Sequence, residues 1–230
     1  MVTILFLASN PTDSQQLRLD EESRAMDQRL RMAEFRDMFE IRQHWAVRVD
    51  DLQECLLRNK PDIVHFSGHG SKSSEIVLQD DSGSSHPVSA RALSKLFSIL
   101  KGTVRCVVLN ACYSEAQALA IAEHVDCVIG MSQAISDPAA ISFTASFYQA
   151  LGYGKSVKTA FELGCAQIDL RNLGEENTPK LVAFNCDPDR VSFENPQHSM
   201  SHDAELRYTE FALKSCDIIN LANITAQCCT

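Results

Sequence analysis

The sequence predicts an α/β protein with a mainly parallel sheet of about six strands and helices on both faces. Short runs of consecutive apolar residues, which are typical of buried strands, alternate along the chain with longer segments of helical spacing. Parallel strands need crossover connections, and helices of this length provide them. The 230 residues are 45% hydrophobic and 22% charged, which is enough for one main domain with a sizeable core.

Four elements are predicted in the first quarter of the chain. The apolar run 1–8 ends at a Ser-Asn-Pro turn, as a first buried strand does. The stretch 14–35 has apolar residues at helical spacing among many charges, which predicts a long surface helix. A strand is expected at 39–47, and a short helix at 52–57 is closed by the following Lys-Pro.

The next elements surround a second buried strand at 62–66. A hairpin is expected around 75–78, because an Asp-Asp-Ser-Gly turn follows it. The hydroxyl of Ser89 is suited to cap a helix that ends at Leu100. Another apolar run at 104–109 predicts the next strand.

The second half of the chain continues the alternation of strand and helix. A helix at 114–123 leads to the apolar strand 126–131. Two helices are expected at 137–151 and 156–168, and a short strand at 180–184 completes the sheet.

Composition changes after Phe184, where a polar stretch punctuated by prolines begins. We therefore expect a domain at 1–187 and a linker at 188–202. Apolar residues at rough helical spacing in 203–230 predict an amphipathic helix that is too short to form a core alone. It is expected to pack on the domain or to connect to another module or partner.

Charge and cysteine content limit the class of protein. A net charge of -9 without a basic run argues against a nucleic-acid surface and favours a peptide or protein partner. The nine cysteines are odd in number and include no Cys-x-x-Cys pair, which predicts reduced thiols. No apolar stretch approaches the ~18 residues that span a membrane, and the opening run lacks the basic start of a signal peptide. The expected location is cytoplasmic.

Two buried strands end in residues that are suited to catalysis. The strand 62–66 is followed by Ser-Gly-His-Gly with His69, and the strand 104–109 by Asn-Ala-Cys with Cys112. Because the carboxyl ends of parallel strands share one edge of a sheet, these residues are expected to meet although they lie 43 positions apart. A cysteine nucleophile with a histidine acid/base is the chemistry that this pair predicts.

Local features favour a reactive cysteine. A helix expected from Ser114 places its positive end near Cys112 and favours the thiolate. The amides of Gly70 and Cys112 are suited to form an oxyanion hole. The alternative interpretation is a buried small cysteine and a structural histidine in a glycine turn. His65 and His69 have His-x3-His spacing but no third ligand, so neither a metal nor another cofactor is expected.

Four ordered blocks together resemble a CHAT domain, the bacterial branch of the caspase- and separase-like cysteine proteases. The blocks are His-Phe-Ser-Gly-His-Gly at 65–70, Leu-Asn-Ala-Cys at 109–112, Gly-Met at 130–131 followed by Asp137, and the stretch 147–157. The resemblance covers about residues 1–184. It implies a caspase-like three-layer α/β/α sandwich and peptide-bond hydrolysis, with Cys112 as nucleophile, His69 as acid/base and Gly70 as an oxyanion donor.

The resemblance also assigns further residues to the site. Ser67 and Asn110 border the two turns and are expected to support them by hydrogen bonds. Asp137 lies where separase-like relatives place an acid that binds a basic residue before the scissile bond. The alternative for Asp137 is a helix N-cap followed by proline. No Arg or Lys occurs between positions 105 and 155, which favours cleavage after a basic or bulky residue.

We therefore expect a cysteine endopeptidase that cleaves a protein substrate and acts as a regulated effector in bacterial signalling, defence or cell death. Its expected partners are the substrate and a sensor or regulatory module, without nucleic acid or membrane. The alternative is a catalytically silent caspase-like scaffold that recruits a protein partner. Nucleotide binding is disfavoured, because the chain has neither of the common phosphate-binding glycine motifs.

Overall fold

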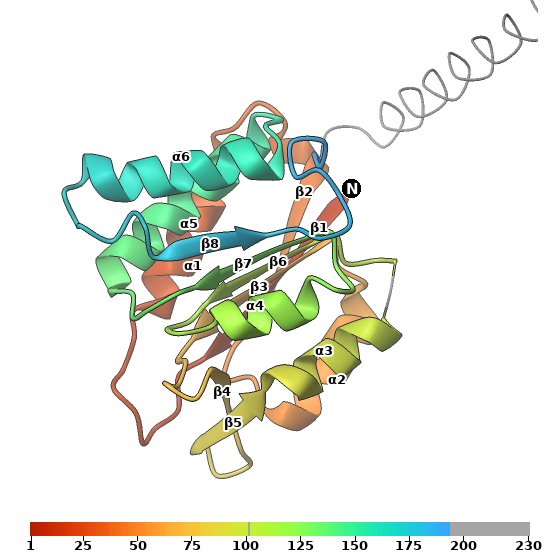
Figure 1. Ribbon diagram of the computed structural model, residues 1–230, viewed down its shortest axis with the longest axis vertical. Coiled ribbons are helices and arrows are strands. Elements are labelled where there is room, and N and C mark those ends of the chain that lie inside the picture. Colours follow the sequence, from red (N-terminus) through yellow and green to blue (C-terminus); the bar gives the residue numbers. More distant parts are fainter. Residues whose placement is uncertain (101, 194–230) are drawn as a thin grey trace, which may run out of the picture. The chain divides into compact units, whose positions relative to one another are not determined.

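The computed structural model describes residues 1–100 and 102–193, which form a six-stranded sheet between two layers of helices (Figure 1). The strand order is β2-β1-β3-β6-β7-β8. The first five of these strands pair in parallel, and β8 pairs antiparallel with β7. The strands are β1 (Val2–Ser9), β2 (Phe39–His44), β3 (Ile63–Gly68), β6 (Cys106–Asn110), β7 (Cys127–Met131) and β8 (Pro179–Val182). The predicted fold class and strand number are confirmed.

The helices divide between the two faces of the sheet, as Figure 1 shows. One face carries α1 (Leu19–Arg31), α5 (Asp137–Gly152) and α6 (Val157–Leu170), and the other carries α2 (Val49–Asn59), α3 (Ala90–Ile99) and α4 (Glu115–Ile121). Alternate residues of β1 enter the two cores: Ile4 and Phe6 pack with the first layer, and Leu5 and Leu7 with the second. A strand that is buried on both faces has no polar face, which explains its unbroken apolar run.

A hairpin of β4 (Glu75–Gln79) and β5 (Ser85–Ser89) forms a separate two-stranded sheet. Isolated bridges join it to the rest of the domain, one between Gly70 and Ile76 and one between Arg48 and Gln79. The predicted Ser89 cap is confirmed, since its side chain accepts a hydrogen bond from the Ala92 amide. Along the chain, β4 of this hairpin is the first element after the turn that contains His69.

The helix predicted over 14–35 is shorter than expected and begins at Leu19. Residues 10–18 form a loop instead. The Asn10 side chain donates to the Leu17 carbonyl at 3.0 Å and accepts from the Leu17 amide at 3.2 Å, which holds the loop closed. Side-chain bonds of this kind compete with helix formation. The strand predicted at 39–47 also ends early, at His44, because Ala46 has a left-handed backbone with φ of 53°.

The last described residues pack on the domain. The Val157 amide donates to the Val191 carbonyl at 2.8 Å, and Arg105 donates to the Ser192 carbonyl at 3.0 Å. The Arg105 guanidinium also lies over the Phe193 ring, 5.2 Å from its centre. The predicted linker at 188–202 thus includes residues that contact the core. The predicted helix at 203–230 lies outside the described residues.

The cysteines in the part of the chain that the structure describes are free thiols. Cys127 and Cys186 come closest, with their sulfur atoms 4.0 Å apart. Within residues 1–100 and 102–193, no helix has both the length and the apolar character needed to cross a membrane.

Candidate active site

The turns after β3 and β6 are in direct backbone contact. Ser67 and Asn110 are paired neighbours on the two parallel strands, just before each strand leaves the sheet. A Cβ atom at Gly70 would lie 1.8 Å from the Cys112 carbonyl oxygen and 3.0 Å from the Cys112 nitrogen. Only a residue without a side chain permits this approach. The structure therefore brings the predicted histidine and cysteine turns together.

Cys112 is partly buried, and a backbone amide points at its sulfur atom. The Ile135 N–H donates to Sγ over 3.5 Å. An N–H directed at sulfur stabilises negative charge on a thiolate. The next residue, Tyr113, has a left-handed backbone with φ of 57°, a conformation that bulky residues rarely adopt. Its amide donates to the Gln133 carbonyl at 3.2 Å, which helps to hold this turn.

Ser114 anchors the cysteine turn to the sheet. Its hydroxyl donates to the Leu109 carbonyl and accepts from the Met131 amide, both at 2.9 Å. One buried side chain thus connects the ends of β6 and β7. The helix start predicted beside Cys112 is also present, since α4 begins at Glu115.

The other described thiols lie in surroundings that keep them protonated. Burial raises the pKa of Cys106 to about 12 and that of Cys165 to about 11. Burial is also the main cause of the raised pKa of each of Cys55, Cys127 and Cys186. Thiols of raised pKa are poor nucleophiles near neutral pH.

His69 is partly buried and oriented by a carbonyl group. Its Nε2 lies 2.7 Å from the Gln15 carbonyl oxygen. A carbonyl only accepts, so Nε2 carries the proton and Nδ1 is left to exchange a proton with a substrate. Among residues 1–100 and 102–193, no hydrogen bond joins His69 to Cys112. A histidine whose main task is to protonate a leaving amine does not need that bond.

The loop that holds His69 is fastened to the hairpin. The Thr12 amide donates to the Gly83 carbonyl at 3.0 Å. The Asp13 carboxylate accepts from the hydroxyl of Ser85 at 2.7 Å and from its amide at 3.0 Å, and these bonds lower the pKa of Asp13. Sequence reasoning missed Gln15, because a main-chain carbonyl has no side-chain signature.

The two amides predicted for an oxyanion hole are unpaired in the described residues. Neither the Gly70 N–H nor the Cys112 N–H donates a hydrogen bond there. One amide belongs to Cys112 itself, and the other belongs to Gly70, whose backbone is in contact with that of Cys112. Paired amides of this kind stabilise an oxygen that becomes negative in a transition state.

Asp137 begins α5 close to the cysteine, two residues after Ile135. The N-cap of this helix is Ser136, whose side chain accepts from the Ala139 amide at 3.4 Å. The alternative N-cap role for Asp137 is therefore wrong. One carboxylate oxygen of Asp137 accepts from the Arg18 amide at 3.3 Å.

Arg18 is a basic residue that lies near Asp137, and this proximity was not predicted from the sequence. Its guanidinium pairs with Glu21, and the Nε–Oε1 distance is 2.8 Å. The bond and the charge of Glu21 raise the pKa of Arg18, and Asp137 adds a smaller effect. Although no Arg or Lys occurs between positions 105 and 155, folding therefore brings a basic residue close to Asp137.

Ser67 and Asn110 both donate to one buried carboxylate, that of Glu22 in α1. His65 is fully buried, and its ring nitrogens contact Glu22 and Tyr148. The described part of the chain contains no group of three side chains suited to a metal. Sequence reasoning missed Glu22, although an acidic residue on the apolar face of α1 was a usable signal.

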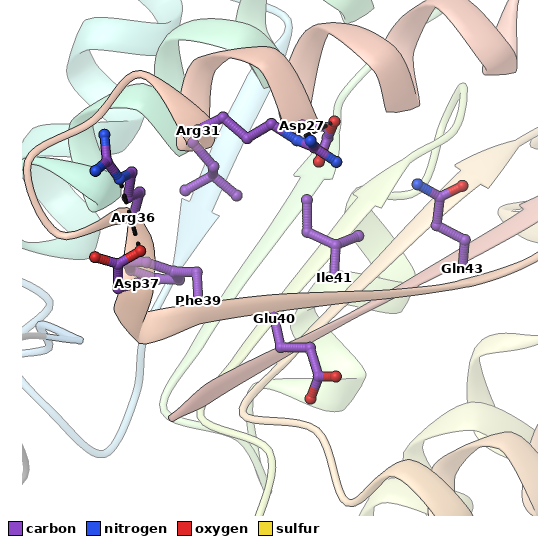
Figure 2. A pocket seen from close by; sticks show the side chains of 9 residues that line it. Asp27, Arg31, Arg36, Asp37, Phe39, Glu40, Ile41 and Gln43 are labelled. Atoms are coloured by element: carbon purple, nitrogen blue, oxygen red, sulfur yellow. Dashed lines mark ion pairs between the residues drawn. The ribbon is translucent and has the colours of Figure 1, made fainter.

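A separate cavity of about 620 Å³ lies between α1 and the edge strand β2 (Figure 2). Its lining includes the ion pair of Arg36 and Asp37, in the short helix η1 (Arg36–Met38), and the apolar residues Phe39 and Ile41. None of the predicted site residues lines it. The candidate active site therefore lies where the turns after β3 and β6 are in contact, and not in this cavity.

The sheet order and the two helical layers define the class of caspase-like α/β proteins, and the turns that follow β3 and β6 are in contact at one end of the sheet. The CHAT domain family model matches residues 3–202, and the chain belongs to this family. The predicted resemblance is confirmed.

Relatives and solved structures agree with this assignment. The chain is 28% identical over 173 residues to a "Probable protease" from Gillisia limnaea, covering 74% of this chain and 31% of the relative. It is 29% identical over 161 residues to a "Roc-COR-CHAT protease" from an unknown prokaryotic organism, covering 67% and 15%. The chain thus spans less than a third of the length of these relatives.

Three solved structures share the fold at low sequence identity. A secreted cysteine protease from Bacteroides thetaiotaomicron, in complex with an irreversible peptide inhibitor, has a TM-score of 0.58 at 12% identity, covering 79% of this chain and 66% of that one. The Arg-specific cysteine proteinase gingipain R has a TM-score of 0.58 at 10% identity, covering 83% and 47%. Caspase-1 from Spodoptera frugiperda has a TM-score of 0.54 at 10% identity, covering 79% and 85%.

Proposed function

We propose that this chain is the catalytic domain of a cysteine endopeptidase that cleaves a protein substrate. The observation that supports this most directly is the contact of the Gly70 backbone with the Cys112 backbone, because it joins the turn that carries His69 to the turn that carries the thiol. The protease names of the two relatives support the same activity.

The geometry suggests a role for each group. The Cys112 thiolate attacks the scissile carbonyl carbon, and the amides of Gly70 and Cys112 bind the resulting oxyanion. Nδ1 of His69 takes up the proton that the Cys112 thiol has lost, and it gives this proton to the amine nitrogen as the carbon–nitrogen bond breaks, while Gln15 holds Nε2. Water then attacks the carbonyl carbon of the acyl-enzyme, the carbon–sulfur bond breaks to release the carboxylic acid product, and a proton from this water regenerates the thiol.

Covalent labelling tests the proposal. The chain is incubated with peptidyl acyloxymethyl ketones that carry Arg, Leu or Asp before the reactive group, and the adduct is located by mass spectrometry. We expect one adduct, on Cys112. A chain that binds such peptides without forming the adduct would favour the alternative function, a catalytically silent scaffold that recruits a partner through this crevice.

We further propose that Asp137 selects a basic residue before the scissile bond. Asp137 lies two residues after Ile135, whose backbone contacts the Cys112 sulfur, and one of the Asp137 carboxylate oxygens has no hydrogen-bond partner in the described residues. We expect Asp137→Asn to slow labelling by the Arg ketone about 10- to 100-fold, because a hydrogen bond to a charged group contributes roughly 1.5–3 kcal/mol. Labelling by the Leu ketone should change little. The control is Asp189→Asn, which removes a carboxylate paired with Lys158 elsewhere; equal losses for both ketones would contradict the pocket role.

The loop 10–18 is expected to be necessary for rapid labelling. Asn10→Ala removes two hydrogen bonds that close the loop and so loosens the Gln15 carbonyl on His69. Bonds of roughly 0.5–1.5 kcal/mol each predict about tenfold slower labelling of Cys112. The control is Asn59→Ala, which removes an asparagine bonded to Cys55 at the end of α2. Unchanged labelling in Asn10→Ala would show that the loop does not position His69.

We also propose that the domain acts as a regulated effector in bacterial signalling, defence or cell death within a larger protein. Its relatives are far longer than this chain, and one of them carries Roc and COR in its name. A regulatory module on the same protein or on a partner would restrain the peptidase. The basal labelling rate of the domain alone, compared with that of the full-length protein, measures this restraint.

A further inference from the structure

The buried carboxylate of Glu22 lies beneath both catalytic turns. Glu22 is only 3% exposed and comes from α1, on the helical layer that also includes α5. Its Oε1 accepts from Asn110 Nδ2 at 2.6 Å, from Thr144 Oγ1 at 2.7 Å and from His65 Nε2 at 2.8 Å. Its Oε2 accepts from the Ser67 hydroxyl. Four donors thus converge on one carboxylate.

Two of these donors stand directly before the proposed catalytic residues. Ser67 precedes His69 by two residues, and Asn110 precedes Cys112 by two residues. The two donors are paired across neighbouring strands. We propose that Glu22 is a positioning residue that fixes the histidine turn relative to the cysteine turn. This inference rests on the proposed peptidase function for its catalytic consequence.

The charge state of Glu22 is consistent with this role. Burial by itself raises the pKa of the carboxyl group, but the hydrogen bond and the charge of His65, together with hydrogen bonds from Ser67 and Asn110, outweigh it and the net pKa is lowered. The carboxylate is therefore ionised near neutral pH and accepts all four bonds. Burial keeps the pKa of Tyr148 well above its usual range, so its hydroxyl stays protonated, and it forms a hydrogen bond with the remaining nitrogen of His65 over 3.1 Å.

A purely structural role for Glu22 makes a different prediction from a positioning role. A structural carboxylate would only hold α1 and α5 on the sheet, and a folded variant would keep normal turns. The variant Glu22→Gln keeps the size of the side chain but replaces one acceptor oxygen with a donor. If the amide nitrogen takes the place of Oε2, the bond with the Ser67 hydroxyl is reversed; if it takes the place of Oε1, the bond from Asn110 is lost. In both orientations the negative charge that strengthens the bonds to the two strand ends is removed.

The experiment compares Glu22→Gln with Asp27→Asn, which removes a partly exposed carboxylate from the same helix, paired with Arg31 at 2.7 Å. Labelling of Cys112 by the peptidyl ketone is measured in the full chain, together with alkylation by iodoacetamide, which needs an accessible thiolate but no bound peptide. Positioning predicts that Glu22→Gln slows ketone labelling at least about tenfold, since small displacements of reacting groups are costly. Alkylation should stay within about threefold of the wild type, because it does not depend on the alignment of the two turns.

A double variant tests whether exchanging the acid and the amide restores labelling of Cys112. Adding Asn110→Asp to Glu22→Gln restores an acid–amide pair with its members exchanged, and we expect it to recover part of the lost labelling. Equal ketone labelling in wild type and Glu22→Gln, with both folded, overturns the positioning role. Loss that the swapped pair does not recover, accompanied by an equal loss of iodoacetamide alkylation, also overturns it.

Hydrogen exchange separates this inference from the peptidase proposal. Positioning predicts faster amide exchange at 66–71 and 109–114 in Glu22→Gln than in Asp27→Asn, whether or not the chain forms an adduct. A wild type that forms no ketone adduct contradicts the proposed function only. Exchange that rises along α1 and α5 but not at the two turns contradicts the positioning role only.

Discussion

Cys112→Ala is expected to form no adduct with any peptidyl ketone, because the variant lacks the nucleophilic sulfur. The thiol is partly buried and its hydrogen bonds to the Ile135 backbone are long, at 3.5 and 3.8 Å, so the variant should melt near the wild-type temperature. His69→Ala keeps the thiol but loses the proton donor, and we expect peptide cleavage to fall about 10²- to 10⁴-fold. Fluorogenic peptide cleavage and mass mapping measure the two effects.

The matched control for this pair is Cys186→Ala, which removes another partly buried thiol. Burial raises the pKa of Cys186, so this cysteine should contribute little labelling near neutral pH. We expect wild-type rates for the control. An adduct that persists in Cys112→Ala, or cleavage that survives in His69→Ala, would place the chemistry on other residues.

Gly70→Ala is expected to separate the two catalytic turns. The added methyl group would lie 1.8 Å from the Cys112 carbonyl oxygen and 2.8 Å from its carbon, so one of the two backbones must move. Overpacking of this kind costs about 1–3 kcal/mol of stability. A displacement of about 1 Å at reacting groups lowers rates roughly 100-fold. Thermal melting and the ketone labelling rate together report both effects.

Ser73→Ala is the control for Gly70→Ala, because it lies in the same connection between β3 and β4 but is exposed. It should label and melt like the wild type. Near-wild-type labelling in Gly70→Ala would mean that the close approach of the turns is not needed for reactivity. The oxyanion role of the Gly70 amide would then lose its main support.

The arrangement of the site explains how distant segments combine into one reactive group. The β1–α1 loop orients His69, the segment before α5 directs an amide at Cys112, and α1 supplies Glu22 below both turns. Each contact joins residues more than 20 positions apart. A regulatory module that shifts α1 would therefore act on both catalytic turns through one helix.

Several features of the site were predictable from local sequence. Buried parallel strands are apolar on both faces, so their ends are visible where polar residues and glycines begin. His69 and Cys112 were placed at one edge for this reason, and the contact of Gly70 with Cys112 places their turns together. The Ser89 cap was predictable because a hydroxyl before an amphipathic run is a local signal.

Other features were not predictable, and each depends on long-range contacts. The helix expected from residue 14 begins at Leu19, because Asn10 and the distant hairpin hold the loop before it. Ser136, rather than Asp137, caps α5, a difference of one position that helical periodicity does not resolve.

The sequence by itself determined the α/β class, the six strands and the cysteine and histidine at the strand ends, because apolar runs and turn residues act over a few positions. Only the tertiary structure decided that Gln15 orients His69, that the Ile135 amide faces Cys112 and that Glu22 joins the two turns. Main-chain groups look the same at every position of a sequence. A carboxylate such as that of Glu22 can join the two turns only after folding has removed water from it and brought four donors to it.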